Sequence, residues 1–479
     1  MAFNSSLYIH ATIITVDKER RIILDGAMLI RRNEIVAIGK TANLLNDPLI
    51  SSDTEQIDCS GRIILPGLIN THAHLAQSLL RGLAEDLSLH SWLCDSIWPL
   101  EANFGPRDGY IGARLTIAEM LRSGTTCFLE AMLTHRSGFE NVATAVDEMG
   151  IRACLGKLVK VEETNKATGM IDPRDRDISS MSIASALEAH NVHHGSCDGR
   201  LHVWMAAGTP RGSPAALHKA IGDACENYGL GLTMHCAEAP KDLDIFHDCY
   251  NSSPAEFCKV NNLIRNGGRT VLAHMVNLDL AKDVHLLSEC GATVAHNPAS
   301  NCKLASGIAP IPELMDGSVN VALGTDGAPC NNTYDMFQEM RLAGLIQKGV
   351  RRDAAVMSAD TILEMATING ARALGLEDKI GSLEVGKLAD FVVLRVGGLH
   401  CAPFDEEQLL HGSVDPVTTV VYSCTGSDIE SVVVDGQVLV QGQRLLCADE
   451  DEILAQARQA VRSIRDSAGV VSRQAKNYV

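Results

Sequence analysis

Residues 67–74 read GLINTHAH, and this stretch decides the fold. It is an apolar run that ends on two histidines, His72 and His74. In a strand, side chains two residues apart lie on the same face, so both imidazoles point to one side of the sheet. Apolar runs of the same kind recur along the chain with helix-like segments between them. Counting the first, the eight runs are residues 67–74, 124–132, 151–159, 201–208, 230–238, 270–276, 292–298 and 319–327.

Strands that alternate with helices predict a parallel β/α architecture, and eight strands close a barrel. One intervening helix is visible in residues 107–124, where Ile111, Leu115 and Ala118 fall near helical spacing and Gly124 supplies a stop. An open doubly wound sheet would instead require a glycine-rich phosphate-binding fingerprint after the first strand, which the sequence lacks. We therefore expect an α/β protein with a (β/α)8 TIM-type barrel over residues 66–385.

Both chain ends predict β-structure. Residues 1–65 alternate polar and apolar positions between turn residues, which favours antiparallel strands, and residues 386–447 repeat this character. We expect these two segments to form one small β-sandwich domain that the barrel interrupts. Residues 448–479 read as a charged amphipathic helix followed by a polar tail, for which packing or an oligomer contact is the expected role.

Composition narrows the partners and the compartment. The formal charge of −18 argues against nucleic acid and anionic membranes, so a small molecule is the expected ligand. The 15 cysteines are scattered, with no CxxC pair, and are expected to be reduced. No apolar run reaches the ~20 residues that cross a bilayer, and the first residues lack the pattern of a secretory signal. A cytoplasmic location is the expectation.

Metal-ligating residue types gather at the predicted strand ends. Singly each has an ordinary explanation, because a histidine can be a core residue and Asp326 can cap the following helix. Together they fall at the carboxyl ends of the strands, where active sites of such barrels lie. The residues are His72, His74, His235, Glu238, His274 and Asp326.

Three imidazoles and a carboxylate with room for water are typical of an open catalytic metal site. The sequence predicts that His72, His74, His235 and Asp326 hold one divalent ion. Zn²⁺ suits this ligand set best, and Fe²⁺ or Mn²⁺ are the alternatives. Glu238, three residues after His235, is expected to overhang the ion from the substrate side.

Residues 65–82, 234–240, 271–278, 295–332 and 381–394 resemble the amidohydrolase superfamily, in particular its cytosine deaminase-like branch of aminohydrolases and chlorohydrolases. The resemblance implies a metal-bearing barrel with a β-sandwich from both chain ends, and the ligand set predicted above.

The resemblance also implies proton-handling roles for Glu238, His274 and Asp326. A bound metal lowers the pKa of water to roughly 7. Asp326 would then accept the water proton, His274 would polarise or orient the nucleophile, and Glu238 would protonate a ring nitrogen and the departing ammonia.

Within that branch, residues 296–310 and 319–328 look most like 5′-methylthioadenosine/S-adenosylhomocysteine deaminases. Residues 91–101 agree, because Trp92 and Glu101 fall where those enzymes place an aromatic wall and a carboxylate for ribose hydroxyls.

Other positions depart from those deaminases. Gln77 resembles the base-binding glutamine of guanine and 8-oxoguanine deaminases. Thr209 is nearest to the place where nucleoside deaminases usually have a histidine, and Lys157 and Lys160 stand where an arginine might be expected. We take Gln77, Trp92, Glu101 and Thr209 as the candidate substrate-binding residues.

These observations predict a metal-dependent hydrolytic deaminase of an amino-substituted N-heterocycle, a purine base or purine nucleoside. An s-triazine chlorohydrolase or alkylaminohydrolase is the alternative within the same chemistry. A non-catalytic amidohydrolase-like scaffold is the alternative from another class. Relatives of this kind are often homodimers or homotetramers, which is the expected assembly.

Overall fold

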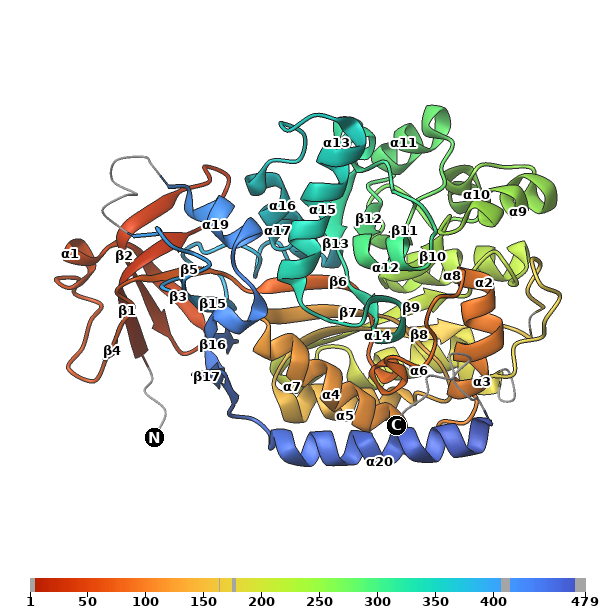
Figure 1. Ribbon diagram of the computed structural model, residues 1–479, viewed down its shortest axis with the longest axis horizontal. Helices are drawn as coiled ribbons and strands as arrows, with labels where there is room; N and C mark the ends of the chain where they lie inside the picture. The colour runs from red at the N-terminus through yellow and green to blue at the C-terminus, as the bar shows by residue number, and fades with distance from the viewer. Residues whose placement is uncertain (1–4, 163, 175–177, 406–413, 470–479) are drawn as a thin grey trace, which may run out of the picture.

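The computed structural model describes residues 5–162, 164–174, 178–405 and 414–469. The strands form two nine-stranded sheets, one at the centre of the barrel and one beside it (Figure 1). The last part of the predicted polar tail, residues 470–479, lies outside the described residues.

The larger domain is built on an all-parallel sheet that closes on itself. Its strands are β6 (Leu68–His74), β7 (Thr125–Leu133), β8 (Arg152–Val159), β9 (Leu201–Ala207), β10 (Leu232–Cys236), β11 (Thr270–His274), β12 (Thr293–His296), β13 (Asn320–Leu323) and β14 (Asp326–Gly327).

Closure occurs where β14 pairs with β6 in parallel, with Asp326 opposite Ala73. Nearby, the amide of Thr325 donates to the carbonyl of His72 at 3.1 Å, and Thr71 Oγ1 donates to the carbonyl of Leu323 at 2.9 Å. Since β13 and β14 flank residues 324–325, the two segments share the eighth strand position. The predicted (β/α)8 barrel is confirmed.

Helices surround the barrel (Figure 1). The longer ones are α4 (Asp108–Arg122), α5 (Phe139–Met149), α6 (Ile183–His193), α8 (Ala215–Tyr228), α9 (Pro240–Tyr250), α11 (Leu280–Glu289) and α15 (Met336–Arg351). The shorter ones are α7 (Ser196–Gly199), α10 (Pro254–Val260), α12 (Pro298–Lys303), α13 (Ile311–Asp316), α14 (Ala328–Asn331), α16 (Ala359–Met365) and α17 (Ile368–Leu374).

The helix predicted before Gly124 is α4, and it ends as expected. Gly124 has a φ of +90°, a conformation that favours glycine, and a Cβ there would lie 2.7 Å from Ile429 Cδ1.

The second sheet joins both ends of the chain, as predicted. Its order is β18-β17-β16-β15-β5-β1-β2-β3, with β4 also paired to β1. The strands are β1 (Ser5–Ile14), β2 (Ile22–Arg31), β3 (Glu34–Lys40), β4 (Glu55–Asp58), β5 (Arg62–Pro66), β15 (Phe391–Arg395), β16 (Ile429–Val434), β17 (Gln437–Gln441) and β18 (Arg444–Leu445). Helix α1 (Thr41–Leu44) packs on β2 and β3 of this sheet, whereas α19 (Pro416–Tyr422) packs on α15 and α16 of the barrel.

The expectation of purely antiparallel strands in residues 1–65 is wrong for two strands. Both β4 and β5 run parallel to β1. The cause is the connection after β3, because residues 41–54 carry the chain back across the sheet before β4 begins. A tight turn joins two neighbouring strands that run in opposite directions. A crossover of this length instead lets the next strand run in the same direction as β1.

The C-terminal helix α20 (Glu450–Ala468) covers one side of the barrel, where it packs on α4 (Figure 1). Its buried positions Ile453, Ala457, Ala460 and Ile464 follow helical spacing. Three of them, Ala457, Ala460 and Ile464, share one apolar cluster with Trp92. That cluster also contains residues of the short helices η1 (Ala76–Leu80), α2 (Leu89–Trp92), η2 (Leu93–Ile97) and α3 (Trp98–Glu101). The packing role predicted for this helix is what the described residues display.

Among the described residues, none of the helices combines the length and the apolar character needed to span a membrane.

One buried ion pair joins the barrel to the second sheet. Arg152, at the start of β8, donates from Nε and Nη2 to both carboxylate oxygens of Asp390, at 2.8 and 3.0 Å. Its Nη2 also lies 3.2 Å from Asp435 Oδ1, and the amide of Asp435 donates to Asp390 at 2.8 Å. The Arg152 and Asp390 side chains are only 3% and 1% exposed.

We expect Arg152→Met to lower the free energy of unfolding by about 3–5 kcal/mol, because the Asp390 carboxylate would stay buried without a partner. Thermal and denaturant unfolding would measure the loss. The matched control is Lys219→Met, which breaks the exposed pair with Asp223 and should cost about 0–1 kcal/mol. Equal losses in the two variants would contradict the anchoring role of Arg152.

Candidate metal centre and substrate pocket

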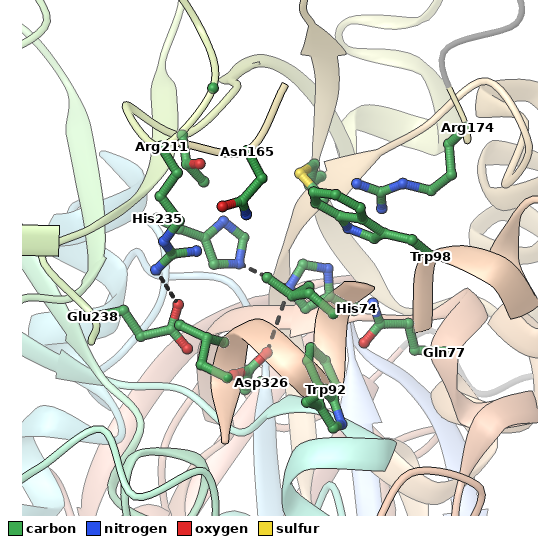
Figure 2. Close-up of a pocket in the computed structure, with 15 residues that line it drawn as sticks. His74, Gln77, Trp92, Trp98, Asn165, Arg174, Arg211, His235, Glu238 and Asp326 are labelled. Atoms are coloured by element: carbon green, nitrogen blue, oxygen red, sulfur yellow. Dashed lines mark hydrogen bonds and ion pairs between the residues drawn. The ribbon is translucent and has the colours of Figure 1, made fainter. Parts of the chain in front are cut away.

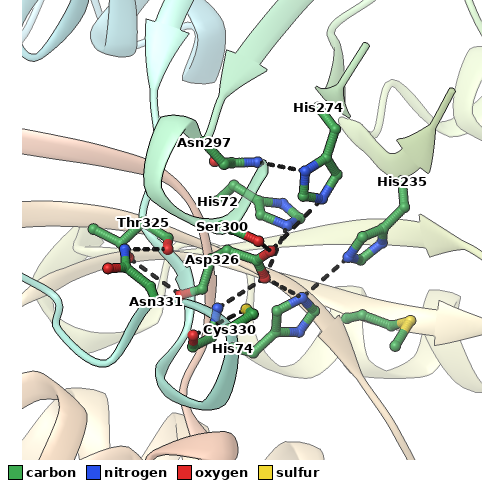
Figure 3. Close-up of polar contacts among 12 residues, drawn as sticks. His72, His74, His235, His274, Asn297, Ser300, Thr325, Asp326, Cys330 and Asn331 are labelled. Carbon is green, nitrogen blue, oxygen red and sulfur yellow. Dashed lines mark hydrogen bonds and ion pairs between the residues drawn. The ribbon is translucent and has the colours of Figure 1, made fainter. Parts of the chain in front are cut away.

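Four side chains converge at the carboxyl ends of the barrel strands (Figure 3). His72 and His74 end β6, His235 lies near the end of β10, and Asp326 begins β14. One ligand atom from each lies within 4.8 Å of the others. His74 Nε2 is 3.1 Å from His235 Nε2 and 3.4 Å from Asp326 Oδ1, while His72 Nε2 is 3.6 Å from the same oxygen. The four predicted ligands are therefore together in one small volume.

The donor atoms of this group fit a divalent cation. Burial lowers the pKa of His74 to about 3 and lowers the pKa values of His72 and His235 as well, so the rings are neutral and offer lone pairs. Both ring nitrogens of His72 are buried without a hydrogen-bond partner. A buried polar atom of this kind calls for a partner, and an ion between the ligands would provide one.

Asp326 is held as a carboxylate in a fixed orientation. Burial alone would raise its pKa, but the neighbouring His72 imidazole, whose Nε2 lies 3.6 Å from Oδ1, holds the pKa well below its ordinary value. Ser300 Oγ donates to Oδ2 at 2.6 Å, and the amide of Gly327 donates to Oδ1 at 2.8 Å. The φ of Asp326 is +63°, in the left-handed region that non-glycine residues rarely adopt. Strained backbone of this kind clusters at functional sites.

Asp326 also belongs to a second group, with Glu238 and His274. His274 Nε2 lies 3.8 Å from Asp326 Oδ2 and 3.9 Å from Glu238 Oε1. On the other side of the ring, Nδ1 is 2.9 Å from Asn301 Oδ1, so a proton on Nδ1 would leave a lone pair on Nε2. The three residues expected to handle protons thus adjoin the metal-ligand group.

Sequence reasoning missed Arg211, which fixes Glu238 (Figure 2). Its Nη2 donates to Glu238 Oε2 at 2.7 Å, and its guanidinium donates to both oxygens of Asp242 at 2.7 Å each. Burial alone would lower the pKa of Arg211, but the two carboxylates raise it above its ordinary value. Asp242 also accepts from the amide of Glu238 at 2.9 Å. Arg211 stands two residues after Thr209 in the stretch 206–214, so the sequence did contain a cation close to a candidate substrate-binding residue. The sequence could not identify its partners, because Glu238 and Asp242 come from another loop.

The metal-ligand group forms one side of a pocket (Figure 2). The predicted residues Gln77, Trp92 and Thr209 line it, whereas Trp98, Asn165 and Arg174 were not anticipated. The full lining is His74, Gln77, Leu89, Trp92, Leu93, Trp98, Met132, Asn165, Arg174, Thr209, Arg211, Gly212, His235, Glu238 and Asp326.

Glu101 lies behind this wall and is absent from the lining. Gln77 Nε2 donates to its Oε1 at 3.0 Å, and Arg174 Nη1 donates to its Oε2 at 2.6 Å. A carboxylate has about four acceptor sites, and these two hydrogen bonds use two of them. The ribose-binding role of Glu101 stays a prediction.

Arg174 provides a cation near the place where Lys160 stands. It pairs with Asp172 at 2.7 Å, and Lys160 Nζ reaches the same oxygen of Asp172 at 2.8 Å. The Arg174 guanidinium also lies 5.1 Å from the centre of a ring of Trp98, a cation–π distance. This pairing holds one aromatic wall of the pocket in place.

The amide of Gln77 presents an acceptor. Its nitrogen is used by Glu101, while its Oε1 is buried and has no hydrogen-bond partner. An unsatisfied buried acceptor at a pocket wall suits a ligand N–H donor.

Comparisons with known proteins agree with this geometry. The model of the amidohydrolase family matches residues 63–439. A 5-methylthioadenosine/S-adenosylhomocysteine deaminase of Desulforudis audaxviator is 38% identical over 92% of this chain and 95% of its own.

Two solved structures are similar over almost the whole chain. An adenosine deaminase from Xanthomonas campestris with bound zinc is 30% identical, with a TM-score of 0.85, covering 96% of this chain and 98% of its own. An atrazine chlorohydrolase from Arthrobacter aurescens complexed with zinc is 26% identical, with a TM-score of 0.83, covering 95% and 100%. With its barrel, its cluster of histidines and aspartate, and a family match over most of its length, this chain belongs to the amidohydrolase family.

Proposed function

We propose that this enzyme is a hydrolytic deaminase that removes the amino group of a purine nucleoside or purine base and releases ammonia. The observation that carries the proposal is the position of Glu238, whose Oε1 lies 3.9 Å from His274 Nε2 beside the metal-ligand group. The names of the adenosine and methylthioadenosine deaminases to which the chain is similar support the purine class.

In this proposal His72, His74, His235 and Asp326 hold one divalent ion, with zinc preferred and iron or manganese as alternatives. The bound zinc of the Xanthomonas campestris relative supports zinc. When bound, such an ion supplies a water whose pKa is lowered to roughly 7.

The protein's own residues would move the protons. Asp326 Oδ2 accepts a proton from the attacking water, and His274 Nε2, 3.8 Å away, orients that water. Glu238 Oε1 delivers a proton to the ring nitrogen next to the reacting carbon, which makes that carbon electrophilic. As the carbonyl forms, the second proton of the water passes through Glu238 to the departing amino group, which leaves as ammonia, and the proton taken by Asp326 restores the Glu238 acid. Because Arg211 engages only Oε2, it positions the carboxyl and leaves Oε1 for the substrate.

Substrate binding is assigned to the pocket wall. Gln77 Oε1 accepts an N–H of the base, Trp92 packs against it, and Thr209 offers a hydroxyl at the pocket edge. Glu101 would accept from the ribose hydroxyls with its two remaining acceptor sites.

Two other functions compete with deamination. The second candidate is the hydrolytic removal of a halide or an alkylamine from an s-triazine. The likeness to an atrazine chlorohydrolase supports it. A non-catalytic scaffold is disfavoured because all four expected ligands are present and grouped.

The compartment and the assembly are part of the same proposal. All 15 cysteines lie in the described residues and each is a free thiol, which supports a reducing compartment such as the cytoplasm. The homodimer or homotetramer stays a prediction.

A substrate panel tests the proposal. We expect ammonia release from aminopurine nucleosides or bases, measured with the zinc-loaded enzyme, and little or none from aminopyrimidines. The panel includes chloro- and alkylamino-s-triazines as the arm for the second candidate. Chloride release from a triazine with no ammonia from any purine would overturn the deaminase assignment.

Replacing the proton donor should separate chemistry from metal binding. We expect Glu238→Gln to keep the same zinc content as the wild type but to lower kcat by about 10²–10⁴-fold, because the amide cannot donate and recover a proton. Glu256→Gln, on the half-buried start of α10, is the matched control and should leave kcat unchanged. Full activity in Glu238→Gln would contradict the proton-transfer role.

Replacing Glu101 should distinguish nucleosides from free bases. If its carboxylate binds ribose hydroxyls, Glu101→Gln loses hydrogen bonds to a charged group worth about 1.5–3 kcal/mol, or roughly 10–100-fold in KM for nucleosides. The KM for free bases should not change. A similar rise for both substrate classes would mean that Glu101 only supports Gln77 and Arg174.

A further inference from the structure

A second group of metal-ligating side chains lies outside the substrate pocket, in the connection between β15 and β16. Strands β15 and β16 are antiparallel neighbours, so the chain leaving β15 lies beside the chain entering β16. His400 and Cys401 come shortly after β15, while Cys424 and Asp428 come shortly before β16. The topology thus brings four potential ligands from two segments to one end of the strand pair. None of the four lines the substrate pocket.

Three of these side chains, His400, Cys401 and Asp428, can present ligand atoms close enough for one ion, and the fourth, Cys424, adjoins Cys401. His400 Nε2 lies 3.0 Å from each oxygen of Asp428, and a ligand atom of Cys401 lies within 4.8 Å of ligand atoms of both. Cys424 Sγ is 3.8 Å from Cys401 Sγ. Two thiolates bound to one zinc ion at ~2.3 Å in tetrahedral geometry are themselves ~3.8 Å apart.

We propose that His400, Cys401, Cys424 and Asp428 form a second metal site that takes a zinc-class divalent ion. Two sulfurs with an imidazole and a carboxylate select a borderline-soft ion over calcium or magnesium. Four protein ligands fill a tetrahedral shell, which is the pattern of a structural rather than a catalytic site.

The surroundings prepare the ligands for an ion. The amide of Thr425 donates to Asp428 Oδ2 at 2.8 Å, which fixes the carboxylate while Oδ1 stays available. Both cysteines are buried, which keeps their sulfurs away from solvent and close to the strand pair. His400 is half-exposed and gives the ion access from solvent.

Bound there, the ion would tie together the two ends of the connection between β15 and β16. It would add to the stability of the second sheet and leave the chemistry of the barrel untouched. Without an ion, the same residues amount to a His–Asp pair and a weak thiol contact.

Cobalt substitution tests the proposal, because the barrel group has only nitrogen and oxygen donors and cannot give a thiolate-to-cobalt charge-transfer band. The protein is purified under reducing conditions, stripped with a chelator and reloaded with Co²⁺ or Zn²⁺. We expect two equivalents of zinc per chain, and a near-ultraviolet thiolate band in the cobalt form.

The variants Cys401→Ser and Cys424→Ser should each lose the band and one equivalent of metal, while keeping the other equivalent and the wild-type hydrolytic activity. Cys249→Ser, at an exposed cysteine of α9, is the matched control and should keep both equivalents and the band.

A wild-type protein with free thiols, one equivalent of zinc and no thiolate band would overturn the second site. So would a Cys401–Cys424 disulfide whose reduction produces no band. The band is measured without substrate, so neither result bears on the deaminase proposal, which the substrate panel tests separately.

Discussion

The pairing of β14 with β6 is the contact on which the active site depends. Asp326 begins the last strand segment of the barrel, and it becomes a neighbour of His72 and His74 only when the ring closes. An open sheet of the same strands would place the first and last at opposite edges. The hydrogen bonds that close the ring, from Thr325 and Thr71, are therefore also the bonds that assemble the ligand set.

The pocket is lined by charges that are balanced locally. Arg211 lies between two carboxylates, and Arg174 between two others, so each buried guanidinium has its counter-charges within hydrogen-bond distance. Leaving any one of these groups unpaired in a dry interior would cost several kcal/mol. The same pairing sets the shape of the site, since a two-pronged guanidinium holds a carboxylate in one orientation. The same contacts therefore neutralise the buried charges and hold the side chains in position.

Much of the barrel and its ligand cluster could be predicted from the sequence, because both rest on short-range patterns. The two-residue spacing of His72 and His74 predicts that both side chains lie on one face of a strand. His235 and Asp326 could be identified because they stand at the ends of predicted strands. Arg211 and Arg174 escaped prediction because their partners are 27 and 73 residues away in sequence, across loops with no periodicity. The parallel direction of β4 and β5 relative to β1 was not predicted for a similar reason. The path of a crossover connection leaves no pattern in the residues of the strands that it joins.

The helix α20 has a consequence for the order of events during synthesis. Trp92 and the short helices around it form a wall of the pocket, yet the apolar cluster that supports them includes Ala457, Ala460 and Ile464 from the end of the chain. A ribosome makes the barrel strands long before it makes this helix. The nascent chain can therefore close its barrel and gather its histidines while the substrate side of the pocket still lacks its outer support. The outer support of the pocket therefore comes from a segment that is synthesised after all the strands of the barrel.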